Sequence, residues 1–549
     1  MAKPDRRESI SKSRLSQEAS SPVPPITTLP LDLIRAVIHE IKVNENRPVF
    51  LCSYPLNDIT LVERLCNSTF SSSDSTLPST HLACTYGVLY FVLREFASSR
   101  SSDPVSQRFS FLRSPNPISE RSDLDEAIST CERNFDALIE DCDVLNVPSF
   151  GSVLALTIGS MKAQSQANPV LECTLISRAA SHCQSLGYQH DSKHENSSNS
   201  RRLFWCVYMI EKQVSLFFGH APLILDADVD VAKPIRSSRP WAHPWDEAFL
   251  KRIELAKIQS RIYEELYSKE TLELDDFERE GRIQELAVSL QFWYFGIPHL
   301  TTSSSKIPGD LLEAKYYATF TILLRALNSS KTGQIHIPPD CFKVARSALQ
   351  FCQRGFNWYQ KIGLSSEKQK YADWDLLSCV LDPFIIMTLH AIASSDPEDE
   401  ILLNEVVSTL QDINQSTSSS SACTKLYKLT STLCHVATGL AKQRGPVIPG
   451  SGWRYSQHED ALSFTGTRAD ADPVSGPDGL VRRRPASASV ADPVSSSIFG
   501  GETDGHSLFH QVVDDDVRDL VGEDEKEELF RFFEGWMGGL VSGLEVFEP

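Results

Sequence analysis

Apolar residues recur along most of this chain at steps of three and four, the spacing that places them on one face of a helix. Such stripes follow one another from about residue 29 to residue 443, and few runs alternate in the way that strands do. Five of the stripes lie at residues 34–41, 124–138, 171–186, 255–266 and 283–293. The pattern predicts an all-α fold, with a large multi-helix body whose helices bury these faces against one another.

One further stripe is defined by signals at both of its ends. Its apolar residues, spaced by four, three, four and three, are Leu203, Val207, Ile210, Val214 and Phe217. Asn199 or Ser200 is suited to cap the first turn, because a short polar side chain accepts a hydrogen bond from the free amides there. Gly219 suits the left-handed residue that ends a helix, and Pro222 lies just beyond it. We therefore expect a helix with one buried face between these signals.

Charged residues flank this helix. Arg201 and Arg202 lie in its first turn, where the helix dipole disfavours positive charge. We expect the two arginines to reach acidic groups elsewhere, and Asp226, Asp228 and Asp230 are candidates. The same spacing also fits an ordinary core helix with solvated charges at both ends.

Composition narrows the class of protein. The length of 549 residues allows several domain-sized units or one large helical body with tails, and 41% apolar residues suffice for a core. A formal charge of -19 repels phosphate backbones, so nucleic acid is not expected to bind over the broad surface.

Thirteen cysteines are present, and none forms the C-x2-C spacing of a zinc knuckle. The first residues contain no apolar signal sequence, and the most apolar stretch, 376–393, is interrupted by Asp382-Pro383. We therefore expect a soluble, intracellular protein with no membrane partner, whose cysteines are reduced core residues.

Composition also divides the chain into four parts. Residues 1–27 are rich in Ser and Pro and are predicted to be disordered. The helical body spans 28–444, and residues 445–506 form a flexible linker of Gly, Pro, Ser, Asp and Ala. Residues 507–549 form an acidic C-terminal tail.

The tail combines charge with large apolar side chains. From residue 511 onward it holds twelve acidic and three basic residues, interspersed with Leu529, Phe530, Phe533 and Trp536. Acidic residues keep such side chains solvated and available to a groove on a partner protein, which is typical of an activation segment. The alternative is a terminal helix that docks on the body through Leu529, Phe533, Trp536 and Leu540.

Sites for metal or catalysis find little support. His190 and His194 are four residues apart, but they lie in a polar segment, and zinc needs two further ligands. Asp515, Asp516 and Asp519 spell the aspartate-rich motif of helical terpene synthases, but too few residues follow for a helical bundle. We therefore expect no enzyme, no cofactor and no metal in this chain, and a metal-dependent all-α enzyme is a remote alternative.

A family resemblance rests on residues 200–234. The matching positions are Arg201, Arg202, Leu203, Phe204, Trp205, Ser215, Gly219, Pro222, Ile224, Asp228, Val229, Asp230 and Pro234. In this pattern the segment resembles the fungal-specific transcription factor domain, the middle homology region of fungal zinc-cluster (Zn2Cys6) regulators. It departs from the family at Glu211-Lys212, where aspartate and arginine are usual, and at His220 and Ala221. These departures put the family's local ion pairs in question and leave the apolar pattern undisturbed.

Three more segments follow in the order of the family. They are residues 175–188, 290–298 and 316–325, although Ala326 replaces a usual proline. With them the resemblance covers about residues 125–395. It implies an all-helical regulatory body in a nuclear regulator of RNA polymerase II transcription, with coactivators or the transcription machinery as partners of the acidic tail.

The family's DNA reader is an N-terminal six-cysteine module that holds two zinc ions, and this chain shows no such module. Its first cysteines are Cys52, Cys66 and Cys84, which are far apart. DNA binding is therefore expected to be lost or to be supplied by a missing N-terminal module or a partner, and zinc would belong to that module alone. Two functions are expected: a regulator, with a homodimer or a heterodimer with a relative as its assembly, or a helical scaffold or inhibitor that titrates a full-length relative.

Overall fold

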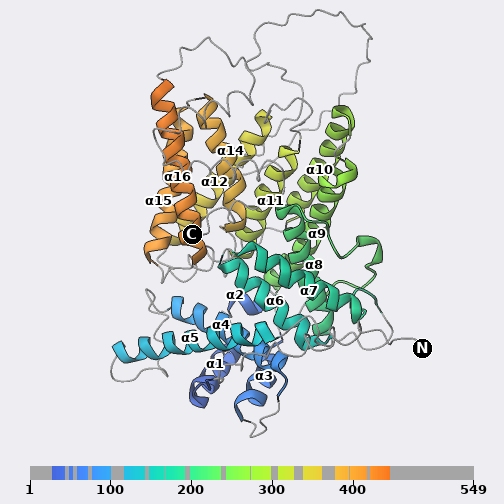
Figure 1. Ribbon diagram of the computed structural model, residues 1–549, viewed down its shortest axis with the longest axis vertical. Coiled ribbons are helices and arrows are strands. Elements are labelled where there is room, and N and C mark those ends of the chain that lie inside the picture. The colour runs from blue at the N-terminus through green and yellow to red at the C-terminus, as the bar shows by residue number, and fades with distance from the viewer. Residues whose placement is uncertain are drawn as a thin grey trace, which may run out of the picture.

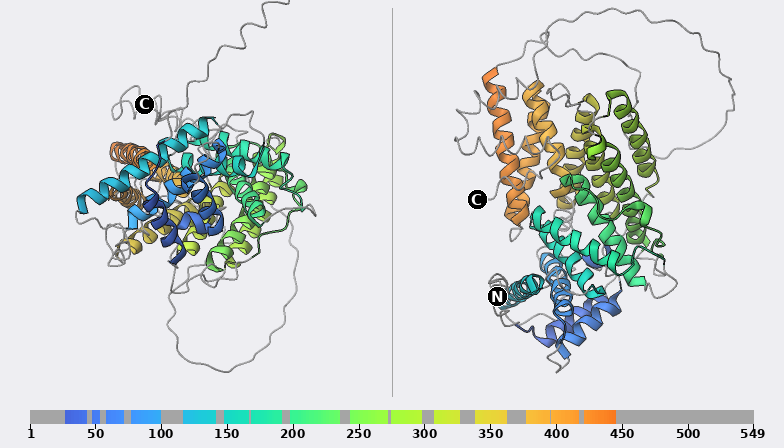
Figure 2. Two further views of the ribbon diagram at one scale, coloured as in Figure 1. Left: turned by 90° about the horizontal axis from the view of Figure 1, so that it is seen from below. Right: turned by 45° about the vertical axis from the view of Figure 1, so that its right-hand side comes forward.

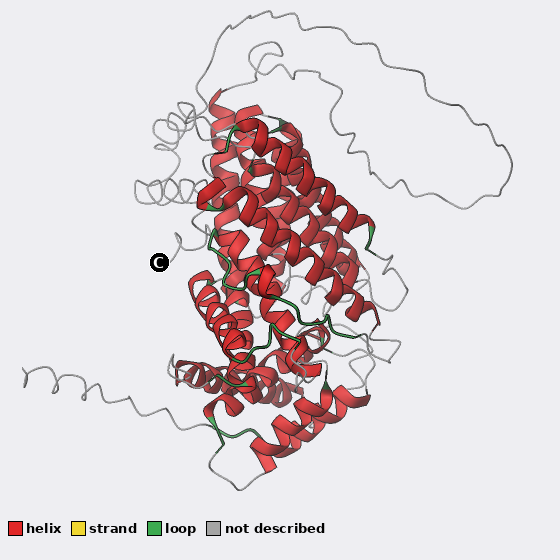
Figure 3. Ribbon diagram, turned by 90° about the vertical axis from the view of Figure 1, so that its right-hand side faces the viewer, coloured by secondary structure: helices red, strands yellow, loops and turns green. Residues whose placement is uncertain are grey.

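The computed structural model describes residues 27–43, 48–53, 58–71, 77–99, 117–141, 148–166, 168–191, 198–235, 243–271, 274–297, 307–326, 338–361, 377–394, 396–416 and 421–444. The regular elements in these ranges are helices, and no strand occurs among them (Figure 3). The all-α prediction is confirmed. The α-helices are α1 (Leu31–Val43), α2 (Val49–Ser53), α3 (Ile59–Ser71), α4 (Ser79–Ser99), α5 (Pro117–Asp141), α6 (Phe150–Ser165), α7 (Pro169–Ser185), α8 (Ser198–Phe218), α9 (His243–Ile262), α10 (Asp276–Phe295), α11 (Ile307–Arg325), α12 (Pro339–Lys361), α14 (Leu377–Ser394), α15 (Pro397–Ser416) and α16 (Ser421–Arg444).

Short polar side chains set the starts of several helices. At α6 the Ser149 hydroxyl accepts a hydrogen bond from the amide of Ser152 at 3.1 Å, and the Ser152 hydroxyl accepts one from the amide of Ser149. Asn168 and Asp275 each accept from the amide three residues ahead, and so cap α7 and α10. These contacts satisfy amides that have no partner inside the helix, as the sequence signals require.

Two large apolar clusters form the interior. The first is built from residues between 29 and 256, and the second from residues between 216 and 436. Helices α8 and α9 supply side chains to both clusters, and Trp245 packs against both. In Figure 1 the blue helices α1–α5 lie at the lower end, α10–α16 stand in the upper part, and α6–α9 lie between them. The second view of Figure 2 shows the same order from end to end.

The five predicted stripes all lie on helices with buried faces, in α1, α5, α7, α9 and α10. The fourth stripe ends in a π-helical turn, η4 (Tyr263–Tyr267), which directly follows α9. Leu171 departs from the prediction because it lies in the first turn of α7 and is 40% exposed. The cysteines whose side chains the structure describes are free, and all of these except Cys173 are buried, as predicted for reduced core residues.

Asp382-Pro383 interrupts the apolar stretch as predicted, but it does not end the helix, because α14 continues through Pro383. Asp382 instead pairs with Arg325 on α11 at 3.0 Å. No helix in the described ranges is both long and apolar enough to cross a membrane. Residues 1–26 and 445–549 lie outside the described residues, so the disordered segment, the linker and the acidic tail stay predictions.

Candidate functional site

Helix α8 carries the first half of the motif and lies deep in the protein, in contact with α6, α7 and α9. Leu203, Val207 and Val214 are buried as the stripe predicts, whereas Ile210 and Phe217 are only partly buried. The prediction of a single buried face was too narrow, because residues 202–209 are all buried. Since α8 joins both apolar clusters, neighbours cover it on several sides.

Three aromatic side chains of α8 pack against one another. The Trp205 ring meets those of Phe204 and Tyr208 edge to face, with centroids 5.4 and 5.2 Å apart. Trp205 is 2% exposed, and its Nε1 donates to the carbonyl oxygen of Ala232 at 3.1 Å. The Tyr208 hydroxyl donates to Asp226 at 2.7 Å. Buried aromatic residues with a polar atom need such a partner, and here the partners lie in the loop of residues 219–235.

A buried ion pair holds the same loop one turn further along α8. Glu211 accepts a hydrogen bond from the amide of Leu223 at 2.5 Å, and the Ser215 hydroxyl donates to the same oxygen at 3.3 Å. Lys212 is fully buried, donates to the carbonyl oxygen of Ile224 and lies 3.4 Å from Asp226. Glu211-Lys212, the departure from the family pattern, therefore makes local contacts of its own.

The two ends of α8 match the sequence signals unequally. Gly219 has a φ of 71°, and the amide of His220 donates to the carbonyl oxygen of Ser215 at 3.0 Å, which is the predicted helix end. The predicted cap at Asn199 or Ser200 is wrong, because α8 already begins at Ser198. The Asn199 side chain instead donates to Asp58 at 3.1 Å, at the start of α3.

The arginines find acidic partners other than the predicted aspartates. Arg202 is 3% exposed, donates to the carbonyl oxygen of Cys52 at 2.9 Å and lies 3.4 Å from Asp246. Its guanidinium also covers the Phe249 ring, 4.0 Å from the centroid. Arg201 pairs with Asp191 at 3.4 Å. Desolvation by burial lowers the pKa of Arg202.

The acidic residues among 226–230 make their contacts within the loop of residues 219–235 and with its neighbours. Asp226 binds the polar atoms of Tyr208 and Lys212, Asp228 is exposed, and Asp230 accepts from the amide of Asp191 at 2.8 Å. The amides of Asp230 and Val231 both donate to the carbonyl oxygen of Gln189. The aspartates therefore tie the loop to α8 and to the turn that follows α7, instead of neutralising the arginines.

Together, α8 and residues 219–235 form one structural unit, which we call the α8 clamp. Trp205, Tyr208, Glu211 and Lys212 each bond to the loop within a buried setting. Pro222 and Pro234, half-buried, lie near its two ends. Sequence reasoning named Asp226 as a candidate partner of the arginines and did not connect it with Tyr208, although the need of a buried tyrosine hydroxyl for a partner was a usable signal. The clamp fixes geometry and offers no group poised for catalysis.

A buried carboxyl group lies close to this unit. Glu172 on α7 is 5% exposed, and burial raises its pKa to about 8 against the opposing charge of Lys315. Lys315 itself donates to Gln213 of α8 at 3.1 Å. A carboxyl whose pKa is raised on folding stabilises the protein below the usual pKa of 4.5, and this stability is lost as the pH rises through 8.

We therefore expect Glu172→Gln to raise the free energy of unfolding at about pH 8 by about 2 kcal/mol or more, because the amide needs no proton to be buried. The gain should shrink at about pH 5, where Glu172 holds its proton in the folded state. Urea unfolding at the two pH values measures both numbers. Glu280→Gln, at an exposed position of α10, is the matched control and should change little. Equal effects of the two substitutions at both pH values would contradict the assignment.

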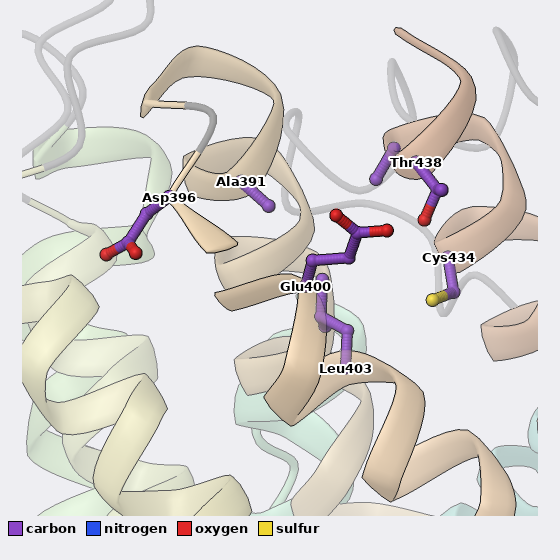
Figure 4. A pocket seen from close by; sticks show the side chains of 7 residues that line it. Ala391, Asp396, Glu400, Leu403, Cys434 and Thr438 are labelled. Carbon is purple, nitrogen blue, oxygen red and sulfur yellow. The ribbon is translucent and has the colours of Figure 1, made fainter. Parts of the chain in front are cut away.

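A second polar cluster joins α12, α14 and α15. Asp399 is fully buried, binds Arg346, and lies 2.5 Å from the imidazole of His390. The small cavity beside it, between α14, α15 and α16, holds about 20 Å³. Figure 4 shows Glu400 pointing toward Cys434 and Thr438, while Asp396, just before α15, lies apart from them. This volume accommodates about one water molecule, so the cavity is too small for a metabolite.

Metal ligation gains no support within the described ranges. No three side chains of His, Cys, Asp or Glu gather there in a way that could hold a metal ion. His190 lies 3.5 Å from Asp230, a residue of the clamp. His194, Asp515, Asp516 and Asp519 lie outside the described residues.

Comparisons with known proteins agree with the resemblance. Residues 109–295 match the family model of the fungal specific transcription factor domain, and the α8 clamp lies within the matched residues. A transcriptional regulatory protein of Schizosaccharomyces pombe, itself uncharacterized, is 24% identical over 302 residues, which cover 49% of this chain and 45% of that protein. A transcriptional regulator of Claviceps purpurea is 22% identical over 303 residues, with 52% and 48% covered. The chain spans about half the length of these relatives, and the predicted extension of the domain to residue 395 reaches beyond the matched residues.

Proposed function

We propose that this chain regulates transcription by RNA polymerase II in the nucleus, and that its helical body positions other proteins. The observation that carries the proposal is the match of residues 109–295, which contain the whole α8 clamp, to the fungal specific transcription factor domain. The two relatives described above are named as transcriptional regulators. The clamp supports a positioning role, because its buried polar atoms bond to one another and to the backbone and so fix the helices around it.

We propose no catalytic role for this chain. The polar side chains of the motif contribute to the clamp and leave no reacting pair in a cavity, which is what catalysis requires. In a regulator the same rigidity has a use, since a preorganised surface binds a partner without an ordering cost.

DNA contact, in this proposal, comes from a zinc-cluster module outside these 549 residues or from a partner protein. The formal charge of -19 disfavours a phosphate backbone over the broad surface. A relative that carries such a module would be the natural partner in a homodimer or heterodimer. If it binds the chain and its output falls as the chain accumulates, the chain acts as an inhibitor that titrates the relative, which is the second candidate function.

The acidic tail provides the test of an activating role. When the full chain is tethered to a promoter through a foreign DNA-binding domain, deletion of residues 511–549 should reduce reporter output to that of the foreign domain alone. The reason is that the tail carries the aromatic residues that a coactivator groove would bind. Reporter activity, normalised to the protein level by immunoblot, is the measurement.

A second variant distinguishes aromatic recognition from charge. Replacing Leu529, Phe530, Phe533 and Trp536 by alanine keeps the twelve acidic residues and should lose output as the deletion does. Output that stays at the level of the full chain in both variants would remove the tail from the proposal. A loss confined to the deletion would assign the effect to charge.

A further inference from the structure

A second cavity of about 380 Å³ opens in the lower part of the molecule, far larger than the one in Figure 4. Its walls come from α3, the start of α4 and the start of α6. None of the thirteen motif residues lines it, so it is independent of the α8 clamp. Its volume falls within the range of pockets that bind small molecules, about 300–1,000 Å³.

The walls are mainly apolar. Leu61 and Leu65 contribute from α3, and Phe150 and Leu154 from α6. Leu65 and Leu154 are buried beneath the opening, while Leu61 is half-buried. Such walls favour the apolar body of a ligand, because its transfer from water releases about 25 cal/mol per Å² of surface.

Two basic side chains also line the cavity. The Nε2 atom of His81 is buried and has no hydrogen-bond partner, which is unusual for a buried polar atom. Arg64 is exposed, and its charge acts on the carboxylate of Asp58 without a direct ion pair among the described residues. The first turn of α6 adds the positive end of a helix dipole, since Phe150 and Gly151 line the same cavity. Arg64 and this helix end are the parts of the wall that favour an anion.

We propose that this cavity binds a small apolar carboxylate. The carboxylate group lies toward Arg64 and the first turn of α6, beside the His81 ring, and the hydrocarbon part lies against Leu61, Leu65 and Leu154. An Arg–carboxylate contact is charge-assisted and gives the site its preference for an anion. The neutral, equally apolar analogue of the same ligand lacks that contact.

The test uses the full chain and octanoate as the probe. Isothermal titration calorimetry should show one-to-one binding of octanoate and binding of octan-1-ol weaker by about tenfold, the worth of one charge-assisted contact. Arg64→Gln should weaken octanoate binding by about tenfold and leave octan-1-ol unchanged. The control Arg35→Gln alters an exposed arginine of α1 that pairs with Asp32, and should change neither affinity.

A third variant tests the location. Leu61→Trp adds bulk at a half-buried position of the wall, so it should abolish binding of both probes while the far-UV circular dichroism and the unfolding midpoint stay as in the parent. Binding of octanoate at full affinity in this variant, equal affinities for octanoate and octan-1-ol, or no heat with octanoate, decanoate or 4-phenylbutyrate at millimolar concentration would each overturn the proposal. These readouts measure binding alone, so they are separate from reporter output.

Discussion

Replacing Trp205 by alanine is expected to lower the free energy of unfolding by about 3–5 kcal/mol. The indole is 2% exposed, lies edge to face with Phe204 and Tyr208, and donates to the backbone of the loop at Ala232. Its removal leaves a cavity whose cost adds to the lost burial, because close-packed neighbours relax only in part. Urea unfolding followed by circular dichroism measures the change.

The control for this substitution is another aromatic residue in a helix. Phe292 on α10 is 74% exposed, so Phe292→Ala should change the free energy of unfolding by no more than about 0.5 kcal/mol. The Trp205→Ala variant should also make the loop of residues 219–235 more accessible to protease, since one of its anchors is lost. If the Trp205→Ala protein unfolds at the same urea concentration as the parent, then α8 does not pack as the structure has it.

Much of the fold could be predicted from sequence, because the spacing of apolar residues along the chain shows where a helix lies and which face it buries. The stripes at Ile34, Phe135 and Leu290 became buried faces, and Gly219 and Asp275 ended and began helices as their chemistry requires. These signals depend on residues a few positions apart. Each helix therefore carries the information about its own ends and its own buried face.

The partners of the charged residues could not be predicted in the same way. Arg202 reaches Asp246 and the carbonyl oxygen of Cys52, which lie 44 and 150 positions away, whereas the acidic run that seemed the nearer candidate binds elsewhere. No local rule relates such positions, because tertiary packing alone brings them together. For the same reason the cavity beside His81 could not be predicted, since its walls come from three helices that are separated along the chain.

The position of α8 explains why a substitution in this helix should lower the stability of the whole helical body. Leu216 belongs to the second apolar cluster, while Trp205 and Val214 belong to the first. A helix shared by two clusters couples their stability, since either cluster loses contacts when the helix shifts. Substitutions in the clamp are therefore expected to change the unfolding of the whole body, and substitutions on the outer face of α10 are not.

Replacing Lys212 by methionine is the second change with a large expected effect, a loss of about 3 kcal/mol or more. Methionine keeps the apolar stem but removes the charge that lies 3.4 Å from Asp226 and 3.9 Å from Glu211. Glu211 is 3% exposed, and burial already raises its pKa against the opposing charge of Lys212. Without the ammonium group, that pKa should rise further.

The loss of stability in Lys212→Met is expected to depend on pH, and the direction of that dependence follows from the raised pKa of Glu211. A carboxyl with a raised pKa contributes stability at low pH that is lost as the pH rises, so the deficit of Lys212→Met should be larger at about pH 8 than at about pH 5. The double variant with Glu211→Gln removes the carboxyl that the single variant leaves buried, and should recover part of the loss at the higher pH. Lys343→Met, whose side chain is 71% exposed, should cost no more than about 0.5 kcal/mol. A deficit that is independent of pH, or a double variant no more stable than the single one, would mean that Lys212 acts through its hydrogen bond to Ile224 and not through its charge.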